Sequence, residues 1–84
     1  MLFFVDARIV PGVDIEPHLE EEVAAVRALR DRGFIEQLFR REDGTGAYLV
    51  VDADSLEAAQ ETVDGLPFPV RGLMTMRVEP IERL

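Results

Sequence analysis

The chain has 84 residues, and its hydrophobic fraction of 48% is typical of one small globular domain and argues against disorder. It contains no cysteine, which excludes disulfides, thiolate metal sites and cysteine nucleophiles. The net charge is −8 and all nine cationic side chains are arginines, so we expect no nucleic-acid partner and no lysine-dependent chemistry.

Residues 2–10 alternate between apolar and mixed positions, which is the period of a β-strand. One face of this predicted strand is wholly apolar and holds Phe3, Val5, Ala7 and Ile9. The opposite face carries Phe4, Asp6 and Arg8. Pro11-Gly12 is a turn signal that ends the strand.

The first helix is expected to begin near Pro17, with Asp14 or Glu16 as its N-terminal cap. Acidic residues gather in its first turn and arginines in its last turn, which complements the helix dipole. Gly33 is the predicted C-terminal cap. The predicted buried stripe of this helix consists of Leu19, Val23, Val26 and Leu29.

The next segment repeats the strand and helix signals. Strands are predicted over residues 34–41 and 47–52, joined by a hairpin turn. Ser55 caps a second helix, which Gly65 and the Pro-Phe-Pro sequence at residues 67–69 are expected to stop. The predicted buried stripe of this second helix consists of Leu56, Ala59, Val63 and Leu66.

A last strand, from residue 71 to residue 80 or 81, completes a βαββαβ order. Right-handed crossovers place both helices on one face of a four-stranded antiparallel sheet, so the predicted fold class is α+β, a ferredoxin-like sandwich. Residues 1–84 are expected to form a single domain. The uncovered sheet face is too apolar to leave in water, and two such faces would pair into a dimeric α+β barrel with a polar-lined cavity. We expect a ligand to bind in that cavity.

Several motifs follow one another along these elements. Met1-Leu2-Phe3 opens the chain, and Val13-Asp14-Ile15-Glu16-Pro17 precedes the first helix. Leu38-Phe39-Arg40 lies in the second strand, Tyr48 begins the run to Asp52 in the third, and Leu66-Pro67-Phe68-Pro69 follows the second helix. In this order the motifs resemble the muconolactone isomerase family over nearly the whole chain. The resemblance implies dimeric barrels of ferredoxin-like protomers and a double-bond shift in an unsaturated lactone carboxylate.

An isomerase of this kind needs a general base, a route for returning the proton and a cation for the substrate carboxylate. Asp6 is the predicted base, and Glu36 is a second candidate if its side of the second strand lines the cavity. The predicted substrate contacts are Arg8, Arg40, Tyr48 and Phe4. The alternative for Asp6 and Arg8 is a structural ion pair across the dimer. If the alternate residues of the second strand face inward, Glu36 and Arg40 are structural or solvated.

The expected function is therefore that of a cofactor-independent, isomerase-like enzyme acting on a small unsaturated lactone or carboxylate. One alternative is a non-catalytic ligand-binding or assembly module of the same barrel type, favoured by Phe4 and Asp6 standing where family members carry His and then Lys. Another is a cofactor-free monooxygenase. No metal-ligand cluster or glycine-rich phosphate loop is visible, so we expect no cofactor or metal. There is no signal peptide and the apolar runs are short, so we expect a cytoplasmic protein without a membrane partner. We expect its partner to be itself, in a homodimer or higher homo-oligomer.

Overall fold

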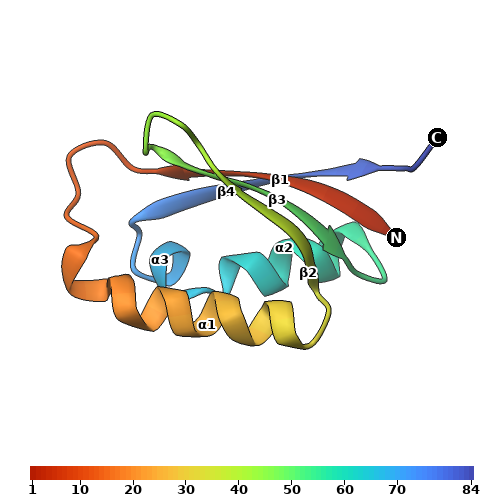
Figure 1. Cartoon of the computed structure of the whole chain (residues 1–84), viewed down its shortest axis with the longest axis horizontal. Coiled ribbons are helices and arrows are strands. Elements are labelled where there is room, and N and C mark those ends of the chain that lie inside the picture. The colour runs from red at the N-terminus through yellow and green to blue at the C-terminus, as the bar shows by residue number, and fades with distance from the viewer.

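The computed structural model describes residues 1–84 as a four-stranded antiparallel sheet with its helices on one side (Figure 1). The strands are β1 (Leu2–Ile9), β2 (Ile35–Arg40), β3 (Gly46–Asp52) and β4 (Met74–Ile81), in the order β2-β3-β1-β4. The helices are α1 (Leu19–Asp31), α2 (Leu56–Asp64) and the short α3 (Pro67–Val70), and a 3-10 turn at Glu16–His18 leads into α1. The predicted element order and the α+β ferredoxin-like fold are confirmed. None of the helices combines the length and the hydropathy that crossing a bilayer requires.

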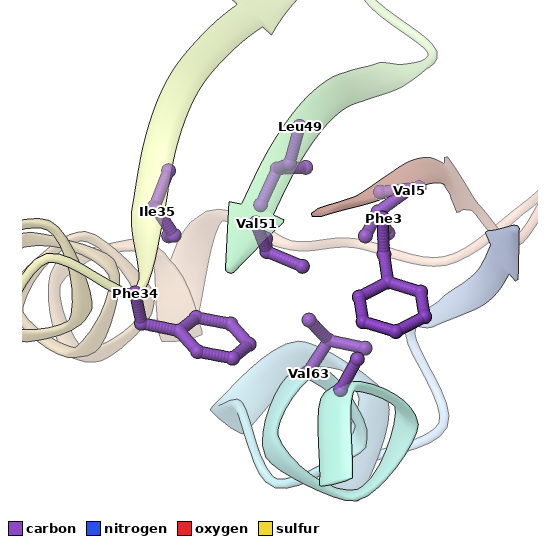
Figure 2. Packing of buried hydrophobic residues seen from close by; sticks show 9 residues of the cluster. Phe3, Val5, Phe34, Ile35, Leu49, Val51 and Val63 are labelled. Atoms are coloured by element: carbon purple, nitrogen blue, oxygen red, sulfur yellow. The ribbon is translucent and has the colours of Figure 1, made fainter. Parts of the chain in front are cut away.

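The core lies between the helices and one face of the sheet. Phe3, Val5 and Ala7 of β1 are buried there, as the alternation along this strand predicts. The other core side chains that pack with them are Phe34, Ile35, Leu49, Val51, Ala59 and Val63 (Figure 2). Burying a side chain the size of Val or Phe stabilises the fold by roughly 1.5–3 kcal/mol, so each of these positions contributes to the stability of the core.

Two of the predicted caps, Ser55 and Gly33, lie at helix ends. The predicted N-cap of the first helix, Asp14 or Glu16, is wrong, because α1 begins after His18 and a 3-10 turn precedes it, and neither start has a side-chain cap. The Ser55 hydroxyl accepts a hydrogen bond from the backbone N–H of Ala58 at 3.0 Å, which confirms it as the N-cap of α2. Gly33, at a φ of +83°, follows the last residues of α1, and the next backbone N–H returns to the carbonyl of Leu29 at 3.0 Å. α2 ends at Asp64 as expected, but Pro67 then begins α3, in which Phe68 is buried.

The predicted stripe of α1 is wrong in its first half. Leu19 and Val23 are 39% and 47% exposed, whereas Glu22 is buried. The reason is a long-range contact, because the Glu22 carboxylate accepts a hydrogen bond from the backbone N–H of Phe68 at 2.8 Å. α3 has no side-chain cap of its own, so this carboxylate turns one side of α1 toward the start of α3. Leu56, the first residue of α2, is 44% exposed, so its predicted place in the buried stripe is also wrong.

Candidate functional site

The sheet face that carries no helices, here named the open face, collects the polar and aromatic residues of β1. Strand alternation places Phe4, Asp6 and Arg8 there, opposite the buried Phe3 and Val5. The register sets their neighbours on β3 as Val50, Tyr48 and Gly46, and on β4 as Glu79, Arg77 and Thr75. The open face is therefore a mixed surface of charges and aromatic rings centred on Asp6.

Asp6 is held between two arginines. Its Oδ2 accepts from Nε and Nη2 of Arg8, each at 3.3 Å, and its Oδ1 accepts from Nη2 of Arg41 at 3.2 Å. The side chain of Arg41 is 14% exposed, whereas that of Arg8 is 62% exposed. One arginine therefore lies within the surface and the other is open to solvent.

Arg41 pairs with Gly46 and reaches Asp6 across β3. The backbone N–H of Arg41 donates to the carbonyl of Gly46 at 2.9 Å, so Arg41 continues the β2–β3 ladder by one residue. Gly46 has no side chain to stand between Arg41 and β1, and a Cβ there would come within 2.0 Å of the carbonyl oxygen of Ala7. The guanidinium crosses this gap and lies 4.6 Å from the centroid of the Tyr48 ring.

Tyr48 extends the cluster to a second aromatic ring. Its ring stacks on that of Phe4, with centroids 5.5 Å apart and an angle of 26° between the planes. Beyond Arg41, a solvent-open hollow of about 400 Å³ is lined by Arg41, Glu42, Asp43 and Tyr48. This end of the open face thus offers a cation and an aromatic surface beside a space large enough for a small molecule.

The charges in the cluster shift each other's titration. Burial acts to raise the pKa of Asp6, but the hydrogen bonds and positive charges of Arg41 and Arg8 outweigh it and leave that pKa below its ordinary value. The hydrogen bond from Arg41 to Asp6 in turn raises the pKa of the Arg41 guanidinium. Asp6 is therefore ionised at neutral pH and is a weaker base than a free carboxylate.

The structure brings together four of the six predicted site residues, namely Phe4, Asp6, Arg8 and Tyr48. Glu36 lies at an irregularity in the register of β2, and its Oε1 accepts from Nη2 of Arg83 at 2.7 Å rather than contacting the cluster. The Asp6–Arg8 ion pair forms within one chain, whereas the structural alternative placed it across a dimer.

The expectation that Arg40 joins this site requires correction. Arg40 pairs with Ala47, whose β1 neighbour is the buried Ala7, so Arg40 lies on the helix side of the sheet. Arg41, which the sequence reasoning missed, takes the place foreseen for Arg40. Arg41 follows Phe39, the cross-strand partner of Tyr48, by two residues and so continues the set of β2 side chains on the open face.

No protein-family model matches the chain, and no curated protein matches it in sequence. Solved structures do match. Muconolactone isomerase superposes with a TM-score of 0.77 and 25% identity, over 100% of this chain and 91% of that one. The 5-chloro-2-hydroxyhydroquinone dehydrochlorinase of Burkholderia phenoliruptrix AC1100, in complex with 2,5-dihydroxybenzoquinone, superposes with a TM-score of 0.76 and 22% identity, over 98% of this chain and 94% of that one.

Fold and site together define a ferredoxin-like α+β protein whose uncovered sheet face carries paired arginines around a carboxylate. The resemblance to the muconolactone isomerase-like family, seen first in the sequence motifs, is confirmed by the full-length structural similarity.

Proposed function

We propose that the protein is a cofactor-independent isomerase of the muconolactone isomerase type, moving a double bond in a small unsaturated lactone or carboxylate. The observation that carries this proposal is the Asp6–Arg8–Arg41 cluster on the open face of a fold similar to muconolactone isomerase along its whole length. The cluster offers a cation for a substrate carboxylate and a carboxylate for proton transfer, two of the groups that the reaction needs.

In this proposal the substrate carboxylate binds to the guanidinium groups of Arg8 and Arg41. Each guanidinium has five N–H donors in a planar fork that matches a carboxylate, and Asp6 uses only part of this capacity. The stacked rings of Tyr48 and Phe4 lie next to them and supply a flat apolar surface for an unsaturated ring.

Asp6 is the proposed proton-transfer group. It removes a proton from the carbon beside the substrate double bond, and a proton is returned to the far carbon of the same three-carbon unit. One C–H bond breaks, another forms and the double bond moves between them, so the reaction consumes no co-reactant. A substrate carboxylate that shares the arginines would partly neutralise their charge, which would raise the pKa of Asp6 toward that of a more effective base.

We further propose that a second copy of the chain covers the open face. Phe39 and Ile81, the cross-strand partners of Tyr48 and Leu2 on this face, are 54% and 40% exposed in the single chain. Large apolar side chains on an uncovered sheet favour packing against another sheet, about 10 Å away. The arginine cluster would then lie inside an enclosed space between two protomers, where water is largely excluded.

Turnover of muconolactone tests the catalytic proposal. The purified protein is incubated with muconolactone and the ultraviolet absorbance of the isomerised product is followed. The wild-type protein is expected to turn over, and Asp6→Asn to lose about 10²-fold or more of the rate, the contribution typical of a general base. Asp54→Asn, at an exposed aspartate without an ion pair, changes the net charge equally and is the matched control. Wild-type turnover no faster than buffer at micromolar protein would contradict isomerase activity on this substrate.

A second candidate function is non-catalytic binding of small carboxylates by the same face. It is favoured by the lowered pKa of Asp6, since a carboxylate held by two arginines is a poor base. Titration calorimetry separates the two functions, because this candidate predicts that muconolactone binds to the wild-type protein and is recovered unchanged. The isomerase proposal predicts binding together with product.

A further inference from the structure

The Asp6 carboxylate stands where a ligand carboxylate would be recognised. Both of its oxygens accept from guanidinium groups, Oδ2 from Arg8 and Oδ1 from Arg41. The three N···O distances of 3.2–3.3 Å are longer than the 2.7–2.9 Å of a tight charge-assisted hydrogen bond. The contacts of Asp6 are therefore longer than those that a guanidinium makes with a well-placed carboxylate.

The donors of Arg41 are only partly satisfied by this arrangement. Its Nε is buried and has no hydrogen-bond partner, although its Nη2 donates to Asp6 and its Cζ lies over the Tyr48 ring. A buried N–H without an acceptor costs free energy, so a purely structural ion pair would be expected to satisfy it. The Asp6 side chain is short and its backbone lies in β1 between two other strands, whereas a free ligand can adjust its position to both arginines.

We propose that Asp6 is an internal occupant of a carboxylate-binding site formed by Arg8 and Arg41, and that an incoming ligand carboxylate competes with it. The inference rests on the part of the proposed function that brings a carboxylate to this face. It adds that the free protein holds its own binding site closed by an intramolecular contact. The ligand class is a small, planar, unsaturated carboxylate, since the Tyr48–Phe4 stack adjoins the arginines.

The competition has a consequence that a structural ion pair lacks. If Asp6 occupies the site, removing its charge frees both arginines, and an external carboxylate binds more tightly. If Asp6 only orients the arginines, the same change leaves them disordered, and binding weakens or stays constant. The sign of the change in ligand affinity therefore shows whether Asp6 competes with the ligand or only orients the arginines.

The experiment is titration calorimetry with 2-furoate, a planar carboxylate that has no isomerisation to undergo. Asp6→Asn is expected to bind 2-furoate about tenfold more tightly than the equally charged control Asp54→Asn, about 1.4 kcal/mol in binding free energy. Arg41→Gln is expected to lose binding. Affinity of Asp6→Asn equal to or below that of the control, or no binding by any variant, would overturn the inference.

A measurement on the wild-type protein keeps the inference testable if Asp6→Asn does not fold. The pKa of Asp6, followed by NMR of its side-chain carboxyl carbon, is expected to rise when 2-furoate saturates the protein, because the arginines are then shared. An unchanged pKa at saturation would count against the competition. Neither measurement requires turnover, so tighter binding by Asp6→Asn with an inactive wild type would retain this inference while removing the isomerase proposal.

Discussion

The two faces of the sheet are formed by the same four strands but differ in composition and burial. On the helix side, β1 contributes Phe3, Val5 and Ala7, which are at most 1% exposed. On the open face the same strand contributes Phe4, Asp6 and Arg8, and its charges form a cluster with Arg41. One face is built to exclude water. The other leaves charged side chains accessible to solvent.

Glu22 on the helix side and Asp6 on the open face have pKa values that are shifted in opposite directions. Burial raises the pKa of Glu22, despite the hydrogen bond it accepts from Phe68, and no cation is bonded to it. Burial also acts to raise the pKa of Asp6, but Arg41 and Arg8 more than reverse that effect. The direction of the pKa shift is therefore set by the bonding partners: a backbone N–H for Glu22 and two guanidinium groups for Asp6.

The largest expected effect concerns the helix side. Phe3→Ala should lower the free energy of unfolding by about 3–5 kcal/mol, because it empties a fully buried position. Phe39→Ala, at a 54% exposed position on the open face, is the matched control and should cost far less at low protein concentration. Urea unfolding measures both. Equal losses for the two variants would mean that the faces do not differ in packing as described.

Gly46→Ala should destabilise the sheet where β1 and β3 approach each other closely. A Cβ at this position meets the carbonyl oxygen of Ala7 at 2.0 Å, so β1 and β3 must separate locally, at a cost of about 3 kcal/mol. Gly65→Ala, where the nearest atoms are at 3.4 Å, is the control and should change stability much less. If Gly46→Ala unfolds at the wild-type urea concentration, the close approach of the two strands at this point is wrong.

A smaller effect is expected at Glu22. Glu22→Ala leaves the buried N–H of Phe68 without its acceptor and should cost about 1–2 kcal/mol, while Glu22→Gln keeps an acceptor and should cost less. The raised pKa also fixes a pH dependence. Between the ordinary Glu value and the raised one, the folded state binds more protons than the unfolded state, so wild-type stability rises relative to Glu22→Gln as the pH falls. Urea unfolding across this range tests the sign, and an opposite slope would contradict the burial of this carboxylate.

The smallest effect is expected for Arg83→Ala. This arginine is 70% exposed and pairs with Glu36 at 2.7 Å, and an exposed ion pair contributes about 0–1 kcal/mol. Thermal unfolding should hardly change, and 2-furoate binding should not change, because this pair lies apart from the arginine cluster. A clear loss of 2-furoate binding would extend the site to this end of the sheet.

The features predictable from the sequence are those that depend on neighbours along the chain. The period of two in β1, the Ser55 cap and the Gly33 terminus all act within a few residues, and all were confirmed. The clearest failure depends on a distant partner. Glu22 faces inward because of Phe68, which is 46 residues away in sequence, and no helical periodicity contains that information.

The choice between Arg40 and Arg41 failed for a related reason. A strand offers two alternating sets of side chains, and only the register with the next strand shows which set meets Asp6. Here the pairing of Phe39 with Tyr48 and the missing side chain of Gly46 select Arg41. The motif resemblance pointed to Arg40. It contains no information on strand register, so it did not indicate that Arg41 crosses β3 to Asp6.

The most direct test of the contrast between the faces is an NMR titration of the wild-type protein with 2-furoate. The backbone and side-chain signals of Phe4, Asp6, Arg8, Arg41 and Tyr48 are expected to shift together with one saturation curve. Those of core residues in α2, such as Val63, should stay in place. Shifts confined to the helix side, or no saturable shift on the open face, would contradict the assignment of the ligand site to the Asp6–Arg8–Arg41 cluster.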